Sequence, residues 1–260
     1  IASCLAWGFG YFGMPHILLR FMAIEDENKL VLSRRIASVW VFIAMAVAII
    51  IGIVGLGMTR AGALDFLGGS SSETIIVKIA GLISRHGVLT AILAGIILAG
   101  ILAATMSTAD SQMLAAASSV SQNVVQDFLH VKLSEKQSLF VARITIAVIA
   151  VLGIVLARDP NSSVFGIVSF AWAGFGGAFG AVMLCALFWK RSNKWGALAG
   201  MISGGACVFL WKYLVRPIGG VWNIYELLPA FFVSLLFIIV VSLLTEAPDE
   251  AQMKEFEAAK

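Results

Sequence analysis

Long apolar stretches dominate this sequence and restrict the folds that are open to it. Hydrophobic residues make up 60% of the chain and charged residues only 13%, so the chain is far more apolar than an ordinary soluble domain. A helix needs about 20 apolar residues to cross a bilayer. We therefore predict an all-α polytopic membrane protein with seven spans, at approximately 1–22, 36–58, 88–118, 139–157, 163–189, 196–214 and 224–244.

The basic residues predict how these spans are oriented. Cytoplasmic loops of membrane proteins carry an excess of Lys and Arg. Of the 18 basic residues, 12 follow the first, third and fifth spans or lie in the tail, and 6 belong to the other face. The richer face is therefore predicted to be cytoplasmic, with the C-terminus inside. Residues 62–86 are then an external segment with a short helix near 74–84. The basic residues report topology and indicate no nucleic-acid partner.

The first span contains an unusual stretch, WGFGYFGMPH, at residues 7–16. Gly8, Gly10 and Gly13 match G-x-G-x-x-G, but long apolar runs flank the match and Pro15 follows at once, unlike a dinucleotide site. Three glycines and a proline instead weaken a helix at membrane depth, where released backbone groups must find other partners. Two interpretations are open: a kinked packing helix, or a discontinuous helix whose broken middle lines a solute site.

Trp7, Tyr11 and Pro15 recur every four residues within that stretch. On any helical stretch such residues share one side, and their side chains form an aromatic and amphipathic wall that suits a small apolar organic solute. Under the second interpretation, these three residues are the predicted substrate-binding residues.

The third span becomes polar in LAATMSTADSQML, residues 102–114, without a helix breaker, so the helix is predicted to continue. Ala104, Ser107 and Thr108 lie on one face, where two hydroxyls and a backbone carbonyl are hard ligands for a small cation. The alternative is that the hydroxyls bond to the preceding turn or to neighbouring helices. Asp110 adds a carboxylate, which is costly inside a span. We interpret it as a candidate point of cation exit toward the cytoplasm.

Small residues recur at helical spacing in three spans, which lets helix backbones approach closely in lipid. These residues are Gly196, Gly200 and Gly204, then Gly176 and Gly180, and finally Gly95 and Ala99. We interpret the three stripes as packing surfaces.

Three motifs resemble the sodium/solute symporter family, in the same order and at similar spacing: AWGFGYFGMPHILLRFMAI, LAATMSTADSQML and SFAWAGFGGAFGAVMLCALFW. The resemblance covers essentially the whole chain and implies the 5+5 inverted-repeat amino-acid transporter fold. It implies that residues 1–189 are the second five-helix repeat, 190–245 two peripheral C-terminal helices and 246–260 a cytoplasmic tail. It also implies that the N-terminal half of the transporter is missing from this sequence.

The same resemblance implies a sodium-coupled secondary transporter that imports proline, or a similar small solute, across the bacterial inner membrane. It carries the family's substrate-site positions to Trp7, Tyr11 and Pro15, and its sodium-site positions to Ala104, Ser107 and Thr108. An enzyme is not expected, because the sequence shows no His or Cys cluster and no nucleophile with a base. Two alternatives stay open: a sodium symporter for another small organic solute, and a membrane sensor built on the same fold.

Overall fold

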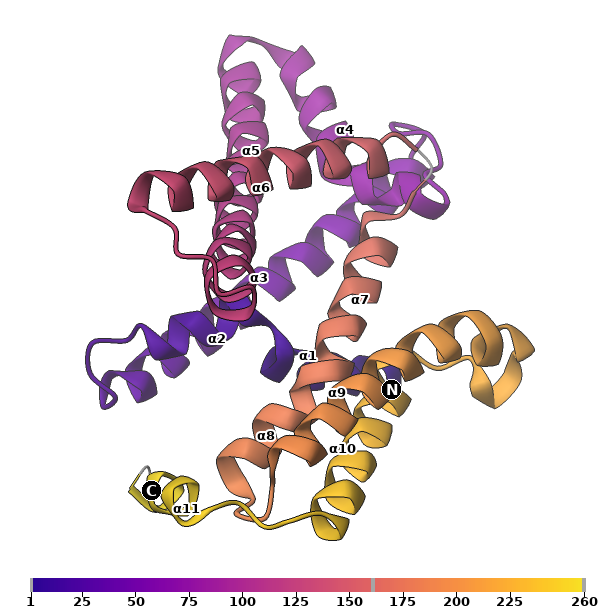
Figure 1. Ribbon diagram of the computed structural model, residues 1–260. Helices are drawn as coiled ribbons and strands as arrows, with labels where there is room; N and C mark the ends of the chain where they lie inside the picture. Colours follow the sequence, from indigo (N-terminus) through magenta and orange to yellow (C-terminus); the bar gives the residue numbers. More distant parts are fainter. Residues whose placement is uncertain (1, 160–161, 259–260) are drawn as a thin grey trace. The chain divides into compact units, whose positions relative to one another are not determined.

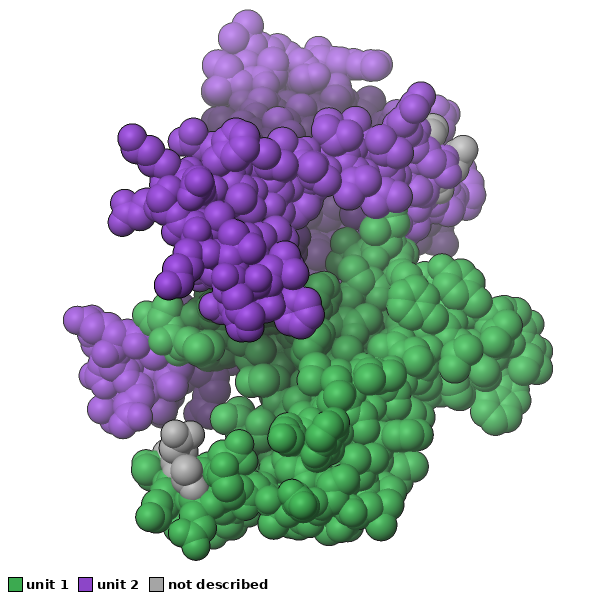
Figure 2. Space-filling view, in the orientation of Figure 1, with its two compact units in different colours: residues 1–23, 165–260 green, residues 24–164 purple. Residues whose placement is uncertain are grey.

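The computed structural model describes residues 2–159 and 162–258, and the regular structure of that part is entirely helical (Figure 1). The predicted all-α class is thereby confirmed. Contacts divide the chain into two compact units, which Figure 2 shows in different colours. Unit 1 contains residues 1–23 and 165–260, and unit 2 contains residues 24–164.

Unit 2 is formed by long helices and one short helix. Its elements in chain order are α3 (Lys29–Arg60), η2 (Gly69–Thr74), α4 (Ile75–Ile83), η3 (Ser84–His86), α5 (Val88–Ser118), η4 (Ser119–Phe128) and α6 (Glu135–Leu156). The short helix predicted near residues 74–84 is confirmed as α4. The polar stretch at 102–114 stays helical, as predicted, and the helix then runs past the expected end at residue 118 because η4 continues it in π-helical form.

Local sequence explains where α6 begins. The Ser134 hydroxyl accepts a hydrogen bond from the Gln137 backbone N–H at 3.4 Å, and the Gln137 side chain accepts one from the Ser134 N–H at 2.9 Å. This reciprocal capping box satisfies backbone donors that the first turn of a helix leaves unpaired.

Unit 1 combines the first residues of the chain with its C-terminal part. Its elements in chain order are α1 (Ala2–Gly10), η1 (Tyr11–Gly13), α2 (Pro15–Met22), α7 (Val164–Phe175), η5 (Gly176–Gly180), α8 (Ala181–Phe188), α9 (Lys194–Leu210), η6 (Trp211–Val215), η7 (Arg216–Ile218), η8 (Gly220–Trp222), α10 (Leu227–Leu244) and α11 (Glu250–Ala258). Helix α11 lies in the tail that the sequence predicts to be cytoplasmic.

Six of the seven predicted spans are helical segments long and apolar enough to cross a membrane. They are Lys29–Arg60, Val88–Phe128, Glu135–Leu156, Val164–Phe188, Lys194–Ile218 and Leu227–Leu244. The remaining span, 1–22, is divided into α1, η1 and α2, each too short to cross alone.

Glycines bring α9 close to its neighbours in unit 1. A Cβ on Gly200 would collide with Ile238 of α10, and one on Gly204 would collide with the Gly177 carbonyl of η5. This close approach confirms the packing role predicted for the α9 stripe. Gly95 of α5 differs, because nothing in the described part of the chain lies within 4 Å of the place its Cβ would take.

Candidate functional site

The first span is broken in its middle. Helix α1 ends at Gly10, one 3-10 turn follows, and α2 begins at Pro15. Between them Met14 is extended, with φ −88° and ψ 112°, a conformation that the following proline favours. The predicted break in the helix is therefore present, and its role as the lining of a solute site stays a prediction.

The glycines at this break serve close packing against α7 and η5. A Cβ on Gly13 would collide with the Phe175 carbonyl, and one on Gly10 would occupy the place of the Trp172 indole. A Cβ on Gly176 would in turn meet the Cα of Gly10 at 2.6 Å. The break in the first span and η5 are far apart in the sequence and thus pack against each other through glycines.

Trp172 of α7 connects two of the predicted substrate-binding residues. Its ring centroid lies 5.7 Å from that of Trp7 and 4.9 Å from that of Tyr11, edge-on to the Tyr11 ring. Its indole N–H donates to the Trp7 carbonyl, in the last turn of α1, at 3.2 Å. Since Tyr11 is 53% exposed, aromatic surface at the break stays open to a ligand.

Pro15 stands apart from this pair along the backbone. It is exposed and is the first residue of α2. The extended residue Met14 interrupts the helix between Tyr11 and Pro15, so the four-residue spacing alone does not place Pro15 on the same face as Trp7 and Tyr11.

The predicted cation residues lie on the exposed surface of α5. The Thr108 hydroxyl donates to the Ala104 carbonyl at 3.2 Å, and the Ser111 hydroxyl donates to the Ser107 carbonyl at 3.0 Å. The bonding to the preceding turn that the sequence left open is therefore present for Thr108. It also brings two oxygen atoms of the predicted cation face, Thr108 Oγ1 and the Ala104 oxygen, next to each other.

Asp110 is exposed on the same helix. Its carboxylate forms no ion pair within residues 2–159 and 162–258. Helix α5 continues beyond it to Ser118, so Asp110 does not lie at a helix end. Asp110 therefore stays a candidate functional residue, because ionisable side chains within membrane-spanning helices are typically functional.

The two groups of candidate residues belong to different units. Trp7, Tyr11 and Pro15 are part of unit 1, whereas Ala104, Ser107, Thr108 and Asp110 are part of unit 2. Within unit 1 the structure adds Trp172, which sequence reasoning did not single out. A tryptophan N–H in an apolar span needs an acceptor, but the sequence does not indicate which carbonyl supplies it.

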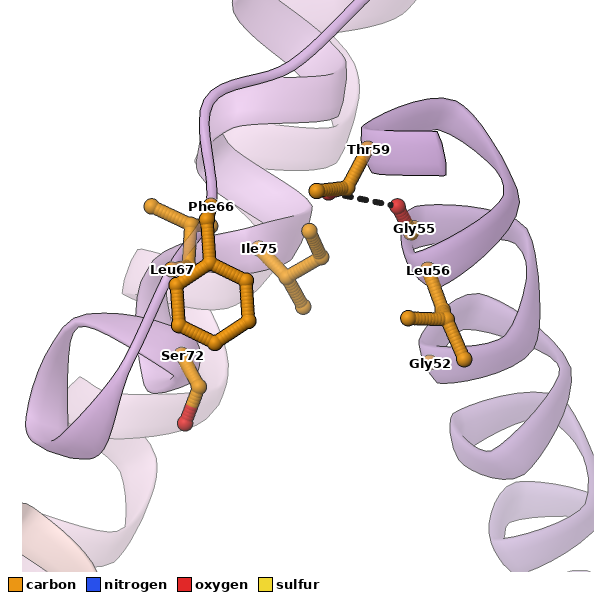
Figure 3. A pocket seen from close by; sticks show the side chains of 8 residues that line it. All are labelled: Gly52, Gly55, Leu56, Thr59, Phe66, Leu67, Ser72 and Ile75. Atoms are coloured by element: carbon orange, nitrogen blue, oxygen red, sulfur yellow. Dashed lines mark hydrogen bonds between the residues drawn. The ribbon is translucent and has the colours of Figure 1, made fainter. Parts of the chain in front are cut away.

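Unit 2 also contains an apolar cleft of about 180 Å³ (Figure 3). It is lined by Gly52, Gly55, Leu56, Thr59, Phe66, Leu67, Ser72 and Ile75. The Thr59 hydroxyl donates to the Gly55 carbonyl at 3.1 Å, and the Ser72 hydroxyl donates to the Gly69 carbonyl at 2.7 Å. Because none of these lining side chains is ionisable, the cleft offers no charged partner to a charged solute.

Comparison with known proteins gives matches to transporters. A family model described as the sodium:solute symporter family matches residues 1–204. The chain is 40% identical to a sodium/proline symporter of Haemophilus influenzae, over 100% of this chain and 51% of that protein. It is 39% identical to an osmoregulated proline transporter of Bacillus subtilis, over 98% of this chain and 50% of that protein.

A sodium/proline symporter of Escherichia coli is 38% identical, over 100% of this chain and 50% of its own length. The chain thus spans about half the length of the curated relatives it matches. No solved structure gives a significant match.

Proposed function

This chain belongs to the sodium:solute symporter family, and from that premise we propose that it forms one half of a sodium-coupled transporter that imports proline. The proposal is supported by relatives named as sodium/proline symporters, which this chain covers over about half their length. We assign the chain to the second half, so that the helices that complete the transporter precede it. Residues 1–189 would form the second inverted repeat, 190–245 two peripheral helices and 246–260 the tail.

The broken helix carries this proposal. Free proline has apolar CH2 groups in its ring, a charged ring nitrogen and a carboxylate, and the break offers a partner to the CH2 groups and to the carboxylate. The exposed Tyr11 ring beside Trp172 provides an aromatic face for the ring of the solute. The start of α2, just after extended Met14, carries the positive end of a helix dipole, which favours a carboxylate. In this proposal Trp7, Tyr11 and Pro15 form the solute site.

Sodium is the proposed coupling ion, held by oxygen atoms on α5. The Ala104 carbonyl and the Ser107 and Thr108 hydroxyls are hard, neutral donors of the kind that suit a small hard cation. They supply only part of a coordination shell, and the preceding half of the transporter would supply the remaining ligands. Coupling then requires that bound sodium raises solute affinity, and by linkage that bound solute raises sodium affinity equally.

Asp110 would act after the binding step. With the predicted orientation, α5 runs from outside to inside, and Asp110 lies two residues inward of Thr108, about 3 Å further along the helix axis. Its unpaired carboxylate would offer a released sodium ion a transient oxygen partner. The whole protein would lie in the bacterial inner membrane with its C-terminus in the cytoplasm.

Uptake by the full-length protein in proteoliposomes tests this function. Labelled proline should accumulate when sodium is high outside, and should not accumulate when potassium replaces sodium. Tyr11→Ala should raise the KM for proline about tenfold, or roughly 1.4 kcal/mol, because it removes the exposed ring beside Trp172. Phe12→Ala is the matched control, since Phe12 is a neighbouring ring that is 40% exposed and should change KM much less.

The same assay separates the alternatives. Sodium-dependent uptake that another organic solute inhibits far more strongly than proline would favour a symporter for that solute. Solute binding without any uptake would favour a sensor. An unchanged KM in Tyr11→Ala would contradict the solute site at the break.

A further inference from the structure

Tyr225 lies in the connection between α9 and α10, and it contacts the first half of the broken helix. Its ring stacks on Trp7, with centroids 5.7 Å apart and planes at 22°. Its backbone N–H donates to the Ser3 hydroxyl at 3.3 Å, and its own hydroxyl donates to the Ser169 carbonyl of α7 at 2.6 Å. One buried residue, 7% exposed, therefore ties α1 to α7 and to the start of α10.

Burial and the neighbouring Glu226 carboxylate raise the pKa of the Tyr225 phenol. A phenol is protonated at physiological pH even at its ordinary pKa, and this shift acts in the same direction, so the hydroxyl can donate to the Ser169 carbonyl. A buried tyrosine hydroxyl without a partner would be costly, so this bond fixes the orientation of the ring.

An ion pair holds the connection that presents Tyr225. The Glu226 side chain is 2% exposed and accepts a hydrogen bond from Arg216 Nη1 at 2.9 Å. Arg216 Nε also donates to Asn223 Oδ1 at 3.1 Å. Only Glu226 is buried, since the Arg216 side chain is 42% exposed, so loss of Arg216 would leave a buried carboxylate uncompensated and destabilise this segment. These bonds from Arg216 close residues 216–226 into a loop, and Tyr225 lies within that loop.

The two halves of the broken helix differ in how firmly they are held. Helix α1 contacts Tyr225 and Trp172, and the Phe9 carbonyl lies against Gly180 of η5. Helix α2, which follows the break, has no buried residue. The described contacts therefore anchor the first half to the C-terminal helices and leave the second half without comparable packing.

We propose that Tyr225, held in place by the Arg216–Glu226 ion pair, is a positioning residue that fixes α1 for solute capture. The proposal rests on the proposed function, because it needs Trp7 and Tyr11 to contact the solute. It gives the two peripheral C-terminal helices a role in solute affinity, since their connection determines where the Trp7 ring stands. Sodium ligation on α5 is not part of this arrangement.

Uptake kinetics and thiol labelling of the full-length protein test the proposal together. Tyr225→Ala and Glu226→Gln should each raise the KM for proline about tenfold, while the half-saturating sodium concentration and the amount of protein in the membrane stay near wild type. Tyr225→Phe keeps the ring on Trp7 and loses only the bond to Ser169, so it should have an intermediate KM. Tyr213→Phe is the matched control, because Tyr213 is 61% exposed, and it should behave as wild type.

Cys4 provides an independent readout, since it is an exposed thiol on α1 one turn before Trp7. The rate of Cys4 alkylation, quantified on the peptide that contains Cys4, should change when proline is added to the wild-type protein. In Tyr225→Ala this change should be absent. Wild-type KM values and a wild-type proline effect on Cys4 in both Tyr225→Ala and Glu226→Gln would overturn the positioning role. A wild-type protein that shows no sodium-dependent proline uptake would instead overturn the proposed function.

Discussion

Thr108 shows at the level of one residue that structural bonding and cation ligation do not exclude each other. A hydroxyl carries one proton and two lone pairs, so donation to the Ala104 carbonyl at 3.2 Å uses only the proton. The lone pairs of Thr108 Oγ1 stay available. The Ala104 carbonyl oxygen also has two lone pairs, so it can accept this hydrogen bond and still offer a lone pair to a cation.

The free lone pairs of the Thr108 hydroxyl predict a sodium effect that a purely structural hydroxyl would not have. The double variant Ser107→Ala, Thr108→Ala should raise the half-saturating sodium concentration for uptake about tenfold or more. Thr105→Ala is the matched control. Thr105 makes the same kind of bond, to the Ile101 carbonyl at 2.9 Å, but it directly follows Ala104 and so points about 100° away from it around the helix. If the double variant and Thr105→Ala had the same sodium dependence, the proposed cation site on α5 would be contradicted.

Some residues of the candidate site could be predicted from the sequence and others could not. Trp7 and Tyr11 stand beside glycines and a proline in a membrane span, a pattern with a physical meaning of its own. Trp172 and Tyr225 carry no such local pattern. Their importance comes from partners far away in the chain, the Trp7 carbonyl and the Trp7 ring, and only the folded arrangement identifies those partners.

At the level of elements, the sequence predicted where a helix breaks but not where it changes from α-helical to π-helical form. Pro15 marks the start of α2 because proline fixes its own φ and restricts the preceding residue. The π-helical segment η5, residues Gly176–Gly180, interrupts a span that the sequence predicts as one continuous helix. Hydropathy does not distinguish an α-helical from a π-helical segment, because both conformations suit the same apolar residues. The spacing of the η5 glycines predicts a packing surface, but it does not show that α9 and α1 are the helices that lie against it.

Packing of α9 gives a prediction that two adjacent glycines can separate. Gly204→Ala and Gly205→Ala should gain the same helix propensity. In Gly204→Ala the new methyl group would collide with the Gly177 carbonyl, whereas in Gly205→Ala its nearest neighbour would be the Ala178 Cβ at 3.9 Å. We expect Gly204→Ala to destabilise the full-length protein by about 1–3 kcal/mol relative to Gly205→Ala. Thermal aggregation in detergent measures the difference, and equal midpoints would contradict the observed contact.

For the whole molecule, composition predicts the membrane spans but not their partners. The long helices of unit 2 expose most of their apolar side chains, including Trp40 and Phe42 on α3. In a membrane, lipid and a neighbouring helix are equally acceptable covers for such side chains. The order and number of spans therefore followed from the sequence, with the one discontinuous span as the exception to helix length. Which apolar faces meet protein did not follow from it.

Orientation in the membrane is the property of the whole molecule that the charges predict most directly. The basic residues divide 12 to 6 between the two faces, which places residues 62–86 outside and the connection before α6 inside. In a Cys4→Ser background, Ser71→Cys should react with a membrane-impermeant maleimide in intact cells. Ser71 suits this test because it is exposed in η2, and among the described residues its hydroxyl bonds to the nearby Gly68 carbonyl.

Lys136→Cys is the opposite probe, on the first turn of α6, and it should react only after the membrane is made permeable. The labelling of these two variants also tests the role proposed for Asp110. If the labelling were reversed, α5 would run from inside to outside, and Asp110 would lie outward of Thr108. Its carboxylate would then meet sodium before Thr108 does, and the proposed role in cation exit would become a role in capture. Labelling of Ser71→Cys alone in intact cells is the result that keeps Asp110 on the release side.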